Sequence, residues 1–112
     1  MKLLRLAGLG LIVNVAGPQF ALSAEWRFCL APSNQEHRIY MTVPFLTVAP
    51  MEAMESGFDQ ALDRSGRRHD SVQCSSGANE PTVRAMRQHA DEFNRQMGNE
   101  VVPVEWRPAA AR

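Results

Sequence analysis

Hydrophobic and polar residues alternate along two short stretches, residues 26–31 and 38–45. A period of two residues is typical of a half-buried β-strand, so each stretch predicts a strand. In the first strand one side carries Trp26, Phe28 and Leu30, and the other carries Arg27, Cys29 and Ala31. In the second strand one side carries Ile39, Met41, Val43 and Phe45. The polar residues 32–37 between the strands predict a turn, so we expect an antiparallel hairpin.

Apolar residues then follow a helical period along residues 50–64. One helical face carries Met51, Met54, Phe58, Ala61 and Leu62. This stripe predicts an amphipathic helix, and Pro50 suits its first position. Gly57 is expected to weaken the helix by about 1 kcal/mol relative to alanine. Gly66 is expected to end it, because glycine readily adopts positive φ.

A second amphipathic helix is predicted to run as far as Met97. Asn79 is a favourable N-cap, and Gly98 is a favourable stop. The apolar stripe of this helix consists of Val83, Met86, Ala90, Phe93 and Met97. We expect the whole stripe to face the core.

Two further strands complete the predicted domain, which covers residues 25–108. Residues 71–74 form a short strand-like stretch, and residues 75–78 are expected to be a loop. Residues 101–106 form the last strand, in which Pro103 indicates a sheet edge because proline has no N–H to donate. Residues 109–112 are expected to be a disordered tail.

The order of these elements, ββαβαβ, predicts an α+β fold. We expect a small two-layer α/β sandwich with about four strands. Each predicted helix has a single apolar stripe, so each should bury one side and expose the other. We expect both helices to pack on one face of the sheet.

Residues 1–24 have the three-part pattern of a secretory signal peptide, with a basic start at Lys2 and Arg5, an apolar stretch, and small residues before Glu25. Cleavage after Ser23 and cleavage after Ala24 both fit. An uncleaved membrane anchor is the alternative. Polar residues and a proline interrupt the apolar run before it reaches the roughly 20 residues that a membrane-spanning helix needs. We therefore expect a periplasmic or secreted protein with no membrane contact after cleavage.

Charge and cysteine content restrict the function further. The chain has 12 basic and 12 acidic residues, and loss of Lys2 and Arg5 with the signal peptide leaves 10 basic residues and a net charge of −2. Nucleic acid binding needs a basic surface, so nucleic acid is not the expected partner. Cys29 and Cys74 are the only cysteines, and such a pair predicts a disulfide in an exported protein. A free thiol pair and two metal ligands are the alternatives.

Several short motifs occur together in this chain: FCLA at residues 28–31, YMTVPF at residues 40–45, Cys74, and VEWRP at residues 104–108. In this combination the chain resembles a group of small exported bacterial proteins to which no function is assigned. The resemblance implies a two-layer α/β domain with paired cysteines. It implies no activity and no functional residue.

Histidines, acids and serines form no recognisable catalytic motif. His69, Asp70 and Ser71 are adjacent, and adjacent side chains of an extended segment point to opposite sides, so they cannot form a hydrolase triad. The other histidines, His37 and His89, do not have the spacing of zinc ligands. We therefore assign no catalytic residue, no metal ligand and no cofactor. A zinc site formed by histidines and an acid stays open as an alternative.

Charged helix faces and one aromatic residue are the candidate binding surfaces. The first helix carries the acidic residues Glu52, Glu55, Asp59 and Asp63, which are expected to be solvated. The second helix carries basic residues on the side opposite its apolar stripe. The possible binding surface consists of Arg84, Arg87, Arg95 and Trp106.

These observations favour a small exported, non-catalytic interaction or binding module of the bacterial envelope. Its expected partner is an unidentified envelope protein or polymer. The alternatives are a small periplasmic hydrolase that uses His69 or His89 with a nearby carboxylate, and a metal-binding protein. A cleft with a histidine and a carboxylate within hydrogen-bond distance would favour the hydrolase.

Overall fold

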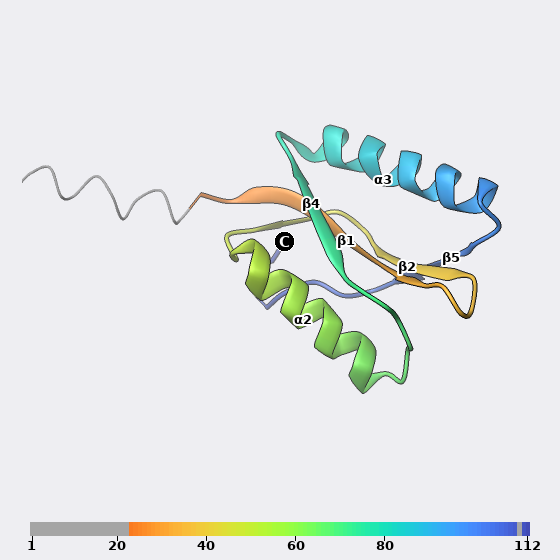
Figure 1. Ribbon diagram of the computed structural model, residues 1–112. Coiled ribbons are helices and arrows are strands. Elements are labelled where there is room, and N and C mark those ends of the chain that lie inside the picture. Colours follow the sequence, from red (N-terminus) through yellow and green to blue (C-terminus); the bar gives the residue numbers. More distant parts are fainter. Residues whose placement is uncertain (1–22, 110) are drawn as a thin grey trace, which may run out of the picture.

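A computed structural model of the protein describes residues 23–109 and 111–112. The predicted signal peptide therefore lies almost entirely outside the described residues. The described part forms five strands and two helices (Figure 1). In chain order they are β1 (Glu25–Ser33), β2 (Arg38–Thr42), β3 (Phe45–Thr47), α2 (Met51–Arg64), β4 (Gln73–Gly77), α3 (Glu80–Gln96) and β5 (Glu100–Val104).

β1 is the central strand of a mixed sheet. It pairs antiparallel with β4 along one side and antiparallel with β2 and β3 along the other. Trp26 and Arg27 pair with both β4 and β3, and Leu30 pairs with both β4 and β2. β2 and β3 therefore both lie on the side of β1 opposite β4, one after the other along the strand. β5 pairs in parallel with β2 and forms an edge of the sheet. The expectation that Pro103 marks an edge strand is confirmed.

The predicted second strand is interrupted at Val43 and Pro44, which separate β2 from β3. Proline has no N–H with which to continue the ladder. The interruption changes the alternation of side chains. Phe45 packs in the same core cluster as Tyr40, whereas Ile39 packs in the cluster on the other face. The expectation that Phe45 and Ile39 share a face is wrong for this reason.

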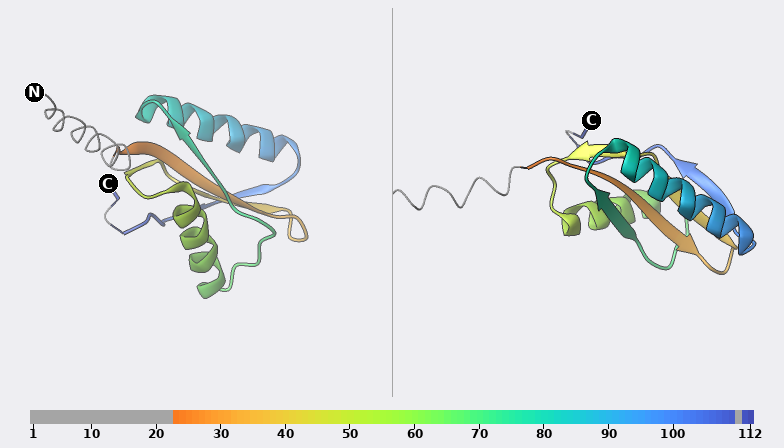
Figure 2. Two further views of the ribbon diagram at one scale, coloured as in Figure 1. Left: turned by 60° about the vertical axis from the view of Figure 1, so that its left-hand side comes forward. Right: turned by 90° about the horizontal axis from the view of Figure 1, so that it is seen from above.

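The two helices cover opposite faces of the sheet, which gives the domain three layers (Figures 1 and 2). In β1, Cys29 and Ala31 pack with the buried residues of α2, whereas Phe28 and Leu30 pack in the cluster that contains Val83 of α3. The α+β class is confirmed. The expected placement of both helices on one face is wrong, because β1 buries side chains on both faces.

α2 agrees closely with its prediction. It begins directly after Pro50, and its buried residues are Met54, Phe58 and Leu62, which confirms the apolar stripe. Gly66 follows the helix with a φ of 73°, a left-handed conformation that glycine adopts without strain. Neither helix in the described part of the chain is long and apolar enough to cross a membrane.

α3 agrees with its prediction at the start and differs at the end. The side-chain Oδ1 of Asn79 accepts a hydrogen bond from the N–H of Thr82 at 2.9 Å, which confirms the N-cap. Val83 is fully buried, but Phe93 and Met97 are 55% and 64% exposed. Apolar spacing identifies the side of a helix that faces the core, but not the length over which the sheet covers it. The expectation that Phe93 and Met97 lie in the core is wrong for this reason.

Pairing with other strands also orders two segments that the sequence predicts to be irregular. β4 extends to Gly77, which pairs with Trp26 of β1, so the predicted loop at residues 75–78 is mostly strand. At the end of the chain, Leu46 and Arg112 exchange two backbone hydrogen bonds of 2.8 and 2.9 Å. Ala111 packs against the core on the α2 side. The end of the predicted tail is therefore held against β3.

The disulfide between Cys29 and Cys74 is confirmed. The two residues lie directly opposite each other in the β1–β4 ladder, with their Cα atoms 4.0 Å apart. The N–H of Cys74 donates to Oε2 of Glu55 at 3.1 Å. Because Glu55 belongs to α2, one small region of the core connects β1, β4 and α2. The cysteines are 45 residues apart, so the bridge closes a long loop.

Reduction of the disulfide is expected to lower the free energy of unfolding by about 4 kcal/mol, the chain-entropy value for a loop of this length. Urea unfolding with and without a phosphine reductant measures the difference. The Cys29→Ala, Cys74→Ala double variant is the control, because its unfolding midpoint should not respond to the reductant. A wild-type midpoint that stays constant after complete reduction would contradict a stabilising role.

Candidate functional site

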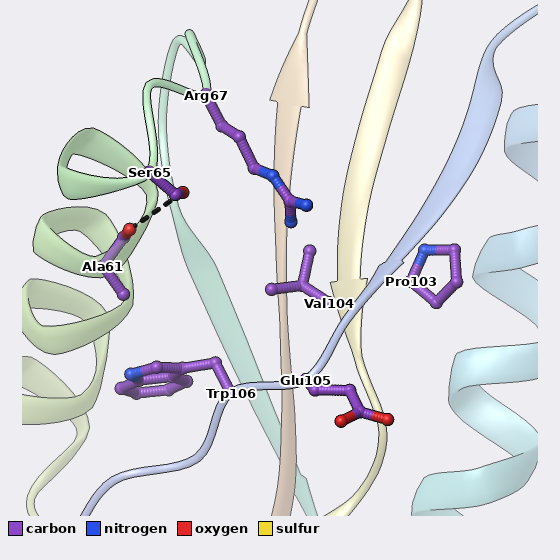
Figure 3. A pocket seen from close by; sticks show the side chains of 7 residues that line it. All are labelled: Ala61, Ser65, Arg67, Pro103, Val104, Glu105 and Trp106. Carbon is purple, nitrogen blue, oxygen red and sulfur yellow. Dashed lines mark hydrogen bonds between the residues drawn. The ribbon is translucent and has the colours of Figure 1, made fainter.

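Helix α2 covers only part of its face of the sheet. Its main contacts are with β4 and β1, whereas α3 on the other face contacts β1, β4 and β5. The remaining part of the α2 face, beside β5, forms an open groove of about 440 Å³ (Figure 3). The residues that line the groove are Ala61, Ser65, Arg67, Pro103, Val104, Glu105 and Trp106.

Arg67 extends from the connector after α2 into this groove (Figure 3). Its guanidinium carbon Cζ lies 5.6 Å from the centre of the Tyr40 ring, within the range of a cation–π contact. Arg67 as a whole is partly buried, and no ion pair among the described residues includes its side chain. The carboxylate of Glu105 is directed away from it (Figure 3). The groove therefore contains a positive charge without a counter-ion from the described part of the chain.

The connector that carries Arg67 is fixed to the C-terminal end of α2. The N–H of Arg67 donates to the carbonyl of Leu62 at 2.9 Å. Its own carbonyl lies 2.9 Å from Nδ1 of His69. The hydroxyl of Ser65 donates to the carbonyl of Ala61 at 3.0 Å (Figure 3). These hydrogen bonds hold the backbone from which the guanidinium projects.

Trp106 forms the other end of the groove (Figure 3). The centre of its ring lies 5.2 Å from that of Phe58 and 6.0 Å from that of Phe45, so it belongs partly to the core. A Cβ atom at Gly57 would lie only 3.1 Å from Cζ2 of Trp106. Gly57 therefore allows α2 to approach the indole ring. A smaller hollow adjoins the groove and is lined by Val43, Glu105, Trp106 and Arg107.

The variant Gly57→Ala tests this close approach. In an ordinary helix the change stabilises by about 1 kcal/mol. Here we expect the gain to be reduced or reversed, because the added methyl group crowds the ring of Trp106. In a Trp106→Ala background the gain of about 1 kcal/mol should return. Urea unfolding of the wild type, both single variants and the double variant measures this coupling, and equal effects of Gly57→Ala in both backgrounds would contradict the contact.

The three arginines of α3 do not form one surface with Trp106, because α3 and Trp106 pack on opposite faces of the sheet. Arg87 is partly buried, and its Nε donates to the carbonyl of Thr42 at 2.6 Å. Arg84 and Arg95 each pair with an acidic residue one turn earlier on the helix. All three already have partners within the protein. A binding role for this face stays a prediction, and the groove is the stronger candidate.

His69 lies in a polar connector in the sequence, but its side chain is only 4% exposed. Its Nε2 lies 2.6 Å from Oδ1 of Asp59, and its Nδ1 lies 2.9 Å from the carbonyl of Arg67. Because both partners are acceptors, the geometry suits a doubly protonated imidazolium. Burial lowers the pKa of His69, but the hydrogen bonds to Arg67 and Asp59 and the charges of Asp59 and Asp63 outweigh it. The net pKa is raised above its ordinary value of 6.5.

Asp59, Asp63 and His69 also place one potential ligand atom each within 4.8 Å of one another. Three protein ligands and an open position are typical of catalytic zinc sites. A metal at Nε2 would have to displace the proton that this atom shares with Asp59. A general base needs a ring nitrogen free to reach its substrate, and both nitrogens of His69 are engaged. The geometry therefore favours a structural ion pair, and the hydrolase and metal alternatives stay predictions.

The stability of the fold is expected to depend on the protonation of His69. Folding raises the pKa of His69 above its ordinary value of 6.5. The imidazolium therefore makes its full contribution to the free energy of unfolding below pH 6.5, and this contribution is lost as the pH rises through the higher pKa of the folded state. Urea unfolding from about pH 5.5 to about pH 9 should show this loss. His69→Gln should lack it, whereas His89→Gln, an exposed control, should keep it. Identical pH profiles for the wild type and His69→Gln would refute the assignment.

Of the groove residues, the sequence predicts only Trp106 as a candidate. Arg67 lies in the run Arg67-Arg68-His69-Asp70, which has the composition of a solvated connector. Its role depends on Tyr40, which lies beneath it from a distant strand. The only local sequence signal for Arg67 as a site residue is that it directly follows Gly66, the glycine that ends α2. Cations are common at the C-terminal ends of helices, so this signal is weak.

Comparison with protein-family models, curated proteins and solved structures finds no match to this chain. No relative therefore supplies a substrate, a partner or a functional residue. The function is inferred from the chemistry of the groove and from the sequence.

Proposed function

We propose that the protein is a small exported, non-catalytic binding module of the bacterial envelope. Its groove between α2 and β5 holds an anionic group of an envelope protein or polymer. The observation that carries this proposal is Arg67, a partly buried residue whose guanidinium lies over the ring of Tyr40 and has no counter-ion among the described residues. Partial removal of a charge from water costs free energy when nothing compensates it. A negatively charged ligand would offset that cost.

The composition of the groove supports binding rather than catalysis. Among the described residues, no histidine or cysteine lines it. Its one hydroxyl, that of Ser65, donates to the carbonyls of Ala61 and Leu62 at the end of α2. A nucleophilic serine needs an adjacent base that accepts its proton, and these carbonyls cannot take that role.

Export is supported by the signal-peptide pattern of residues 1–24 and by the disulfide. Disulfides form and persist in oxidising compartments such as the bacterial periplasm and the extracellular space. After cleavage, the binding module would act in the periplasm or outside the cell.

The variant Arg67→Gln tests the proposal. The ¹⁵N-labelled protein is titrated with fragments of anionic envelope polysaccharides and with peptides from a digest of envelope proteins. At least one of these should shift the indole N–H resonance of Trp106. A hydrogen bond between charged partners contributes about 1.5–3 kcal/mol, so Arg67→Gln should weaken this binding at least about tenfold.

Arg95→Gln is the matched control, because it removes the same charge from an exposed arginine that is paired with Asp91. It should change the affinity by less than about twofold, as expected for an exposed ion pair. If Arg95→Gln abolished binding and Arg67→Gln did not, the site would lie on α3. If no ligand shifted Trp106, the groove would not be a binding site.

A further inference from the structure

The surroundings of Arg67 restrict the anion that the groove can bind. A guanidinium is planar and matches a carboxylate with two parallel hydrogen bonds. Ala61 and Ser65 place the groove at the C-terminal end of α2, where the helix dipole is negative. Phosphate groups favour the opposite end of a helix, where free N–H groups and a positive dipole are available. The negative end of the dipole opposes any anion, and it opposes a doubly charged phosphate more than a singly charged carboxylate, so the carboxylate is the better fit of the two.

Apolar side chains line part of the groove between Arg67 and Trp106. Ala61 on α2 and Val104 on β5 lie on opposite sides of the groove, and Trp106 closes its end (Figure 3). The ring of Trp106 packs against Phe58, which leaves less of it free to stack on a sugar. An apolar side chain beside the carboxylate would bury these walls, which favours its binding.

β5 beside the groove is an edge strand of the sheet. The N–H of Glu100 donates to the carbonyl of His37 on the β2 side at 2.8 Å. Backbone groups alternate in direction along a strand, so Glu100 and Val104 face β2, whereas Val101 and Pro103 face the open edge. Pro103 presents a carbonyl and no N–H. Because proline has no N–H to donate, this edge cannot pair with an added peptide strand in a regular ladder.

We propose that the groove recognises the carboxyl terminus of a peptide whose last residue is apolar. Arg67 binds the terminal carboxylate, and Ala61, Val104 and Trp106 surround the last side chain. This inference rests on the proposed function and specifies the chemistry of the partner. An internal peptide segment lacks the terminal carboxylate, and an acidic polysaccharide lacks the apolar side chain.

Fluorescence polarisation with the disulfide-bonded protein tests this specificity. The probes are a labelled pentapeptide that ends in leucine, the same peptide with a C-terminal amide, and a free acid that ends in serine. The free acid with leucine should bind most tightly. Amidation should weaken binding at least about tenfold, the effect of losing a charged hydrogen-bond partner. The serine peptide should also bind more weakly, because it leaves the apolar walls uncovered.

A double-mutant cycle assigns the carboxylate to its partner. In Arg67→Gln the free acid and the amide should bind equally. In Arg38→Gln, which removes an exposed arginine paired with Glu36 and Glu100, the full difference should persist. Arg67→Lys should recover part of it, because it restores the charge without the planar fork. Unfolding midpoints establish that the variants are folded, and the amidated peptide tests the same contact without any variant.

Equal binding of the acid and the amide to the wild type would overturn the proposal. Isovalerate has a carboxylate and a branched apolar group but no peptide bond. If it bound the groove as tightly as the peptide does, the proposal would also be overturned, because the ligand would then be a small free carboxylate. If anionic polysaccharide shifted Trp106 and the peptides did not, the ligand assignment would fail while the proposed binding function survived. If neither class of ligand shifted Trp106, both would fail.

Discussion

The structure depends on a central strand that is hydrogen-bonded on both sides and buried on both faces. β1 pairs with β4 on one side and with β2 and β3 on the other, and each of its faces contributes to a separate core cluster. The disulfide joins β1 to β4, and the N–H of Cys74 binds Glu55 of α2. α2 is therefore fixed over β4 and β1 rather than over β2 and β5. The open strip beside β5 follows directly from that position, and this strip is the groove.

Much of this fold can be predicted from the sequence, because local patterns determine local structure. The apolar stripe of α2, the Asn79 cap, the Gly66 stop and the cysteine pair all follow from spacing and residue type. The placement of the helices on opposite faces is harder to predict. Cys29 and Ala31 are small, and with Arg27 they resemble the less apolar side of a half-buried strand. A strand buried on both faces is apolar on both sides. Phe28-Cys29-Leu30-Ala31 has that property, and this run is the signal that favours two covering layers.

The candidate site is less predictable, because its parts come from segments that are distant in the sequence. Trp106 attracts attention as an aromatic residue near the end of a strand. The cation over Tyr40 and the pairing of His69 with Asp59 depend on how the connector after α2 folds back over the sheet and the helix. Periodicity describes one element at a time, so contacts between elements are outside what it predicts. For the same reason, Arg87 has the helix position of a solvated residue and yet donates to the carbonyl of Thr42.

The position of Arg67 also bears on how well the groove can bind. A flexible arginine loses rotamer entropy when a ligand immobilises it, and an arginine held in place before binding loses less. Hydrogen bonds to Leu62 and His69 fix the backbone of Arg67, and the ring of Tyr40 lies beneath its guanidinium. The carbonyl of Arg67 faces the imidazolium that holds the connector to α2, while its side chain faces the groove. The protonation state of His69 and a ligand in the groove would therefore both affect Arg67. The contact of His69 with Asp59 therefore also helps to fix the backbone from which the proposed binding cation projects.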